Sequence, residues 1–199
     1  MATPATAFPE PVLASAVLFR AVMDAFARPG EVRPLTGVVA PPSPLSATAA
    51  ALAAALLDYE TPVWLDAALS AHPQVGNWIR LHTGAHVTAD PHEAAFAFIA
   101  DPERAPDFDA FSLGTPDYPD RSTTLVLQVE GFGIGAPMSL SGPGIAHVRS
   151  FSAAPLPSDF AARLVANRAL FPRGVDLILV SPDAVVALPR SVHVTEERN

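Results

Sequence analysis

The residues best suited to metal chemistry lie between positions 82 and 93. His82 and His86 are four residues apart, a spacing that can place two imidazoles on one helix face. Further possible ligands follow downstream: Asp90, His92 and Glu93. Gly84 interrupts the helical spacing, however, and no glutamate follows His82 directly. We therefore predict no metal site, with His82 at a helix terminus and the other side chains in solvated loops.

A glycine-rich turn at residues 141–145 is a candidate anion site. Backbone N–H groups at Gly142 and Gly144 could cradle an anion after a predicted strand. Pro143 removes one donor, and no helix is predicted after the turn, so the support of a helix dipole is missing. We favour a tight structural turn over the anion cradle. A second set of spaced glycines indicates a flexible hairpin loop: Gly131, Gly133 and Gly135.

Two arginines at predicted strand ends are candidates for clamping a carboxylate or a phosphate. Arg121 and Arg190 each lie beside turn residues, and the planar guanidinium suits bidentate recognition of such oxygens. They could equally form structural ion pairs with Asp176 or Asp120, and the sequence leaves both interpretations open.

Several kinds of covalent chemistry are excluded for this chain by itself. All 12 basic residues other than histidine are arginine, so lysine is absent, and there is no cysteine. Without lysine, the chain has neither a Walker-type phosphate lysine nor an internal aldimine to pyridoxal phosphate. Without cysteine, it has no disulfide, iron–sulfur cluster or cysteine-ligated zinc. No G-x-S-x-G nucleophile motif occurs, and we interpret Asp58 and Glu60 as solvated turn caps rather than a catalytic pair.

The composition limits the partners. The net charge of -8 and the isoelectric point near 5.1 argue against a nucleic-acid or anionic-membrane surface, which needs clustered cations. Only 16% of residues are charged, so either part of the surface is buried in a partner or the alanine content inflates the apolar share. The first 21 residues lack the basic start of a secretory signal, and no apolar run reaches about 18 residues. We expect a cytoplasmic protein.

Apolar runs bounded by turn residues must position these side chains. Extended runs predict buried strands at 63–65, 94–100, 123–129, 138–140, 175–180 and 185–188. The strand at 185–188 is expected to be the hairpin partner of the strand at 175–180. Helical spacing predicts helices at 15–27, 45–57, 75–81 and 158–170. We expect Ser15 and Ser158 to cap their helices and Val165 to point inward. Residues 1–199 are predicted to form one α/β domain, a three-layer mixed sheet with helices on both faces.

Several short motifs, in order along nearly the whole chain, resemble one family. They are Phe19-Arg20, Arg28-Pro29-Gly30, Leu57-Asp58, Thr61 to Leu65, His82-Thr83, Gly114, Thr124 to Val129 without Val126, Leu140 to Ile145, Phe171-Pro172, Gly174 to Leu179, Leu188 to Arg190, and His193-Val194. Each motif alone is weak, but their order and spacing resemble those of the PhnH family. Members of this family are subunits of the bacterial carbon–phosphorus lyase system.

This resemblance implies a fold like a reduced fold-type I pyridoxal-phosphate-dependent transferase without the cofactor. It also implies a homodimer that joins PhnG, PhnI and PhnJ in a core complex. With PhnG, PhnI and PhnL, such a subunit supports displacement of adenine from ATP by methylphosphonate, giving alpha-D-ribose 1-methylphosphonate 5-triphosphate. The catalytic chemistry is expected mainly in PhnI and PhnJ, so no catalytic residue is carried over to this chain.

Three functional hypotheses follow. The first is a non-catalytic assembly subunit that needs no cofactor. In the second, Arg190 or Arg121 binds phosphonate or triphosphate oxygens of the substrates, and His82 orients or protonates a substrate. The third is a small-molecule-binding protein unrelated to phosphonates. Candidate ligand or interface residues, mostly motif positions, are His82, Thr83, Arg121, Gly142, Gly144, Asp176 and Arg190.

Overall fold

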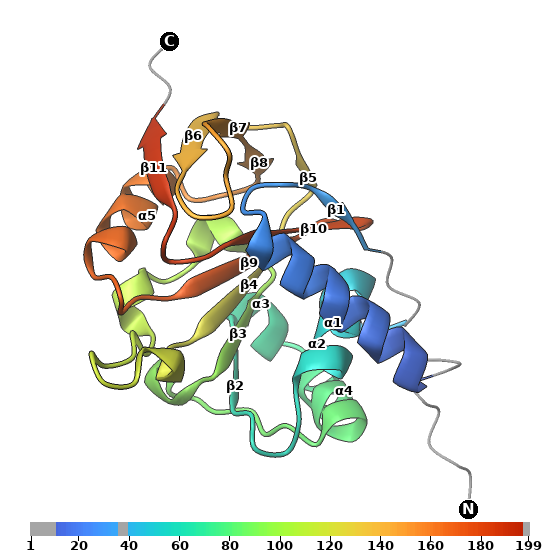
Figure 1. Cartoon of the computed structure of the whole chain (residues 1–199). Coiled ribbons are helices and arrows are strands. Elements are labelled where there is room, and N and C mark those ends of the chain that lie inside the picture. The colour runs from blue at the N-terminus through green and yellow to red at the C-terminus, as the bar shows by residue number, and fades with distance from the viewer. Residues whose placement is uncertain (1–10, 36–39, 197–199) are drawn as a thin grey trace, which may run out of the picture.

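Parallel strands form the centre of the sheet (Figure 1). The computed structural model describes residues 11–35 and 40–196. Of the first 21 residues, which were compared with a secretory signal, the first ten therefore lie outside the described residues. In the described chain, six strands pair in the order β1-β10-β9-β4-β3-β2. The four strands from β2 to β9 are parallel, and β10 and β1 are antiparallel. Their bounds are β1 Arg33–Pro34, β2 Val63–Leu65, β3 Phe96–Ile99, β4 Thr124–Gln128, β9 Asp176–Val180 and β10 Ala184–Leu188.

The remaining elements lie on the two faces of this sheet. The helices are α1 Pro11–Ala27, α2 Ala47–Leu56, α3 Ala67–Ser70, α4 Pro73–Thr83 and α5 Phe160–Ala169. Two smaller antiparallel sheets are β11-β6-β7 and β5-β8. Their strands are β5 Gly131–Phe132, β6 Met138–Ser141, β7 Arg149–Phe151, β8 Ala153–Ala154 and β11 His193–Glu196. Short 3₁₀ turns lie between α4 and β3 and between β3 and β4: Pro91–Glu93 in the first connection, and Pro102–Arg104, Phe108–Ala110 and Pro119–Arg121 in the second.

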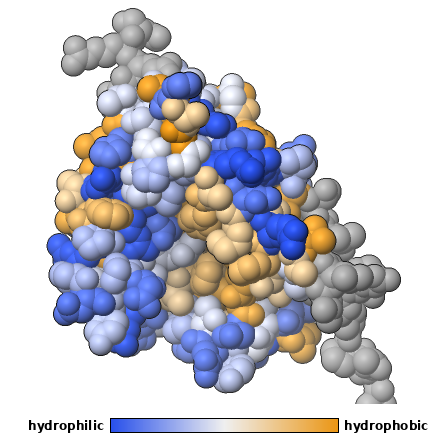
Figure 2. All heavy atoms as spheres, in the orientation of Figure 1, coloured by the Kyte–Doolittle hydropathy of each residue, from blue (hydrophilic) through white to orange (hydrophobic). Residues whose placement is uncertain are grey.

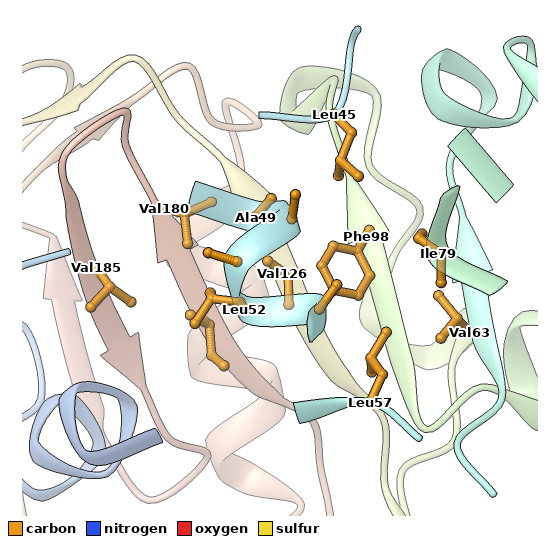
Figure 3. Packing of buried hydrophobic residues seen from close by; sticks show 14 of the residues in the cluster. Leu45, Ala49, Leu52, Leu57, Val63, Ile79, Phe98, Val126, Val180 and Val185 are labelled. Atoms are coloured by element: carbon orange, nitrogen blue, oxygen red, sulfur yellow. The ribbon is translucent and has the colours of Figure 1, made fainter. Parts of the chain in front are cut away.

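Alternation along the central strands divides the core into two clusters. Phe98, Val126 and Ile178 face the layer of α1, α2 and α4, as the close view in Figure 3 shows for Phe98 and Val126. Their neighbours Leu127 and Leu179 face α5 and the β11-β6-β7 sheet. Each such side chain contributes about 1.5–3 kcal/mol when buried. The predicted mixed α/β sheet is thus confirmed, but its second face is covered by one helix and a small sheet rather than by helices alone.

Small side chains let α2 lie close against the sheet. Ala49, Ala50 and Ala53 are fully buried, and alanine also has the highest helix propensity. The Ser46 hydroxyl accepts a hydrogen bond from the N–H of Ala49 at 3.1 Å and caps the helix. The predicted range of 45–57 is therefore about a turn too long in total.

The two predicted serine caps are wrong. α1 begins at Pro11, four residues before Ser15, because proline fits the first turn of a helix, where its missing N–H is not needed. Asp159, not Ser158, precedes α5. Val165 is 51% exposed rather than inward. The buried stripe of α5 follows helical spacing through Phe160, Leu164 and Asn167, and residue 165 falls outside it.

Side-chain hydrogen bonds close the carboxyl ends of the parallel strands. Asp66, which is 5% exposed, accepts from the N–H groups of Leu69 (2.9 Å), Ala100 (2.8 Å) and Asp101 (2.9 Å). It thereby caps α3 and ties the end of β2 to the end of β3.

Among the described residues, every helix is too short or too polar to cross a bilayer.

Candidate functional site

The end of α1 and the turn between β6 and β7 pack directly against each other. Gly144 has a φ of 80°, and a Cβ there would lie 2.4 Å from the carbonyl oxygen of Ala27 and 2.8 Å from Cδ of Pro29. Residue 144 must therefore be glycine for two reasons, because side chains disfavour this φ and because no space remains for one. We call this contact, formed by residues 27–30 and 141–145, the glycine junction.

Two more glycines hold the junction together. The N–H of Gly30 donates to the carbonyl oxygen of Ala187 in β10 at 3.2 Å. A Cβ on Gly30 would lie 2.5 Å from Cδ1 of Leu140 and 3.1 Å from Cδ of Arg149. Gly142, with a φ of 126°, lies close to the backbone that connects β10 and β11. These contacts support the structural-turn interpretation of residues 141–145, and ligand binding by Gly142 and Gly144 stays a prediction.

An ionic cluster lies beside the glycine junction. Nη2 of Arg33 is 2.9 Å from Oε1 of Glu31, and Nη2 of Arg149 is 3.6 Å from Oε2 of the same carboxylate. The side chains are 26%, 33% and 33% exposed for Arg33, Glu31 and Arg149. Sequence reasoning missed this Arg–Glu–Arg cluster, because no motif spans it and only the fold brings β7 next to the end of α1.

Arg190 forms a mostly buried ion pair with Asp176 at the start of β9. Its Nε is 3.1 Å from Oδ1, its backbone N–H donates to the same oxygen at 2.8 Å, and Nη2 pairs with Oδ2. The guanidinium also donates to the carbonyl oxygen of Pro119 at 2.7 Å and to the hydroxyl of Ser122. The side chains of Arg190 and Asp176 are only 13% and 22% exposed, so the guanidinium acts as a structural tie. This arrangement favours the ion-pair alternative over a ligand clamp.

Arg121 lies in the segment that Arg190 fastens, but its own side chain is exposed. Its guanidinium carbon is 4.3 Å from the centroid of the Tyr118 ring, a cation–π contact. No carboxylate of the described residues lies within ion-pair distance of it, so the alternative of an ion pair with Asp120 or Asp176 does not hold for Arg121.

His82 and Thr83 end α4. Nδ1 of His82 is 2.8 Å from the carbonyl oxygen of Trp78, and the two rings stack with centroids 4.2 Å apart. The hydroxyl of Thr83 donates to the carbonyl oxygen of Ile79 at 2.8 Å, and Gly84 closes the helix with a φ of 81°. The helix-terminal interpretation of His82 is confirmed, and a role in ligand orientation stays a prediction.

The downstream side chains considered as possible metal ligands serve local turns. The Asp90 carboxylate accepts from the N–H of His92 at 2.9 Å, and the Glu93 carboxylate accepts from the hydroxyl of Thr88 at 3.0 Å. In residues 11–35 and 40–196, no group of three histidine or acidic side chains is arranged to hold a metal ion.

Asp58 and Glu60 form a turn. Oδ1 of Asp58 accepts from the hydroxyl of Thr61 at 2.7 Å and from the N–H of Glu60 at 2.9 Å. The Thr61 hydroxyl, followed by the Glu60 N–H, lowers the pKa of Asp58 below its ordinary value. A general acid at neutral pH needs a raised pKa, so this carboxyl group is a turn cap.

Comparison with known proteins identifies the family. The family model described as "Bacterial phosphonate metabolism protein (PhnH)" matches residues 6–195. The chain belongs to the PhnH family. It is 46% identical over 191 residues to the "Alpha-D-ribose 1-methylphosphonate 5-triphosphate synthase subunit PhnH" of Rhizobium meliloti (strain 1021), covering 96% of this chain and 95% of that one. A "Putative C-P lyase subunit protein HtxG" of Stutzerimonas stutzeri is 38% identical over 82 residues, 41% of this chain and 42% of its own.

In this PhnH-family chain, the predicted site residues fall in three separate places. His82 and Thr83 end α4, and Gly142 and Gly144 belong to the glycine junction. Asp176 starts β9 and pairs with Arg190, which follows β10, near the segment of Arg121. A hollow of about 480 Å³ lies elsewhere, between residues 135–138 and 153–161, and contains none of them. The structure does not bring the candidates together in one pocket.

Replacing Gly144 with alanine should destabilise this PhnH-family fold by at least about 3 kcal/mol, because backbone strain and a steric clash add. Gly133 is the matched control, since its φ is also positive (78°) but no atom lies within 4 Å of an added Cβ. Gly133→Ala should cost only about 1–2 kcal/mol. Urea denaturation measures both, and equal losses would contradict the close-packing argument.

Replacing Arg190 with alanine should cost about 3–5 kcal/mol of unfolding free energy, since Asp176 is left unpaired at a mostly buried position. Arg104→Ala is the control. Arg104 is 88% exposed and forms an ion pair with Asp101 at 3.6 Å, and such an exposed pair contributes about 0–1 kcal/mol to stability. Thermal and urea unfolding compare the two variants. An Arg190→Ala protein as stable as the Arg104→Ala protein would show that this tie is dispensable.

Proposed function

We propose that the chain is a PhnH-type subunit of the multisubunit enzyme that makes alpha-D-ribose 1-methylphosphonate 5-triphosphate during phosphonate breakdown. The observation that carries this proposal is the 46% identity to the Rhizobium meliloti subunit over 95% of that protein. In the proposed reaction, methylphosphonate displaces adenine from ATP. The chain supports this reaction together with the subunits PhnG, PhnI and PhnL. The family match gives no support to an unrelated small-molecule-binding protein.

An assembly role suits the side chains of this chain better than a catalytic one. Lysine and cysteine are absent, and Arg190 and Asp176 are committed to each other. His82 and Thr83 complete a helix end. The alternative, that the chain contributes phosphonate- or ATP-binding residues, retains support from Arg121, whose exposed guanidinium forms no ion pair in the described part of the chain.

The outer face of α1 suits a contact with another subunit. Four exposed apolar residues recur every three or four positions along it and form the α1 stripe: Ala16, Phe19, Met23 and Ala27. Phe19 is 51% and Met23 45% exposed. Figure 2 shows an apolar patch, tan to orange, on the face where α1 lies in Figure 1. We propose that this stripe forms the homodimer contact, while PhnG, PhnI and PhnJ are the partners of the larger complex.

Three further features belong to this proposal. We propose that residues 1–199 act as one domain and that the protein works in the cytoplasm without a cofactor of its own. We also propose that its mixed sheet is a reduced relative of the fold-type I pyridoxal-phosphate-dependent transferases. The absence of lysine agrees with loss of that cofactor, which needs a lysine for its aldimine.

Co-expression with PhnG, PhnI and PhnJ should give one large stoichiometric complex that contains this chain. Addition of PhnL, ATP and methylphosphonate should then release adenine, and omission of this chain should abolish that release. Sizing by light scattering and chromatographic detection of adenine measure the two steps. Partners that assemble and release adenine equally well without the chain would refute the proposed role.

Replacing Phe19 and Met23 with aspartate should convert the isolated dimer to a monomer, because charges would be buried in an apolar contact. The control is Val165→Asp on α5, since Val165 is equally exposed at 51% but lies outside the stripe. Light scattering gives the mass, and circular dichroism checks folding. A folded double variant that stays dimeric would exclude the α1 stripe as the dimer surface.

A further inference from the structure

The Arg–Glu–Arg cluster beside the glycine junction carries more positive charge than it neutralises. Arg33 and Arg149 share the one carboxylate of Glu31, at 2.9 Å and 3.6 Å. Among the described residues, neither arginine has another ion pair. The cluster therefore keeps one net positive charge in a chain whose overall charge is -8.

Both guanidinium groups also contain a donor that no described residue satisfies. Nε of Arg33 and Nε of Arg149 are buried, and neither has a hydrogen-bond partner in the part of the chain that the structure describes. Each side chain nevertheless stays about one-quarter to one-third exposed, so its outer nitrogens reach solvent. A buried donor without a partner opposes folding, and a water or an ion bound at the cluster is one explanation for retaining it.

The fold fixes the position of this charge. Arg149 begins β7 and pairs with Leu140 of β6, and its Cδ would lie 3.1 Å from a Cβ on Gly30. The aliphatic part of Arg149 thus passes over a residue that has no side chain. Arg33 is held from the other side, because it pairs with Val185 at the edge of the main sheet. Both backbones are anchored, so the two guanidinium groups converge without help from a ligand.

We propose that Arg33 and Arg149 form a binding site for a tetrahedral oxyanion, namely a phosphate or phosphonate group. Guanidinium groups bind such oxygens through paired N–H donors, and the group offers enough oxygens for two arginines at once. A second negative charge on the anion would compete with Glu31 for the outer nitrogens. Glu31 then holds the two arginines in place while the site is empty.

The proposal rests on these side chains, and only the choice of methylphosphonate as a second probe depends on the proposed function. The shared chemistry of the two probes is the tetrahedral oxyanion. A preference for methylphosphonate indicates a substrate site, and equal or tighter binding of inorganic phosphate indicates a site for the phosphates of a nucleotide. Either preference supports an oxyanion site. The alternative occupant is a carboxylate of a partner subunit.

The test is titration of the purified full chain with inorganic phosphate and with methylphosphonate, followed by calorimetry and phosphorus NMR line widths. Arg33→Gln and Arg149→Gln should each weaken binding by about tenfold or more, the loss expected for one charge-assisted hydrogen bond. Arg104→Gln, which removes an exposed arginine elsewhere, should leave binding within about twofold. Circular dichroism and thermal melting confirm that each variant is folded.

Glu31→Gln gives a test of opposite sign. It removes the competing carboxylate and keeps its shape, so both anions should bind more tightly by about threefold or more. A purely structural cluster would not show a gain. Three outcomes overturn the proposal: no binding of either anion at about 10 mM, binding that the arginine variants leave unchanged, or weaker binding by Glu31→Gln.

A further outcome separates this proposal from the proposed function. If neither anion binds but Arg149→Gln no longer co-purifies with PhnG, PhnI and PhnJ, the cluster contacts a partner and the oxyanion site is refuted. The assembly role would then stand. If the anions bind as expected but the chain joins no complex, the oxyanion site stands and the proposed function fails.

Discussion

The rest of the structure depends on covering both faces of the parallel strands β3, β4 and β9. Their side chains are apolar on both faces, so neither face can remain in water. The helices before and after β2 cover one face, and the chain between β4 and β9 must cover the other. That segment supplies one helix, α5, and the strands β6 and β7, which pair with β11 to complete the second layer. The glycine junction exists because this small sheet has to meet the end of α1.

Side chains close part of the carboxyl edge of the sheet, where open α/β sheets usually bind ligands. Asp66 closes the ends of β2 and β3 by accepting three backbone N–H groups. Gln128, at the end of β4, accepts from the N–H of Ser46 and donates to the carbonyl oxygen of Pro44. The ends of β2, β3 and β4 are thus tied by side chains to neighbouring backbone, including the loop before α2.

The strands could be predicted from the sequence because their signal is local. Residues 123–129 and 175–180 are short apolar runs between turn residues, and both are buried strands of the sheet. Helix starts were less predictable, because Ser15 and Ser158 have the right chemistry for caps but proline and packing set the actual boundaries. The Arg–Glu–Arg cluster could not be predicted at all. Its members belong to different layers, and only three-dimensional packing makes one carboxylate neighbour two arginines.

The glycines of residues 28–30 and 141–145 contribute to chemistry indirectly. Gly144 lets the β6–β7 turn approach the carbonyl oxygen of Ala27, and Gly30 leaves room for the side chain of Arg149. A side chain at either position would push β7 away from the end of α1. Arg149 would then lose its contact with Glu31, and Arg33 would have that carboxylate alone. The glycine junction and the ionic cluster are therefore one device, in which the absence of side chains at two turns positions a charged side chain between them.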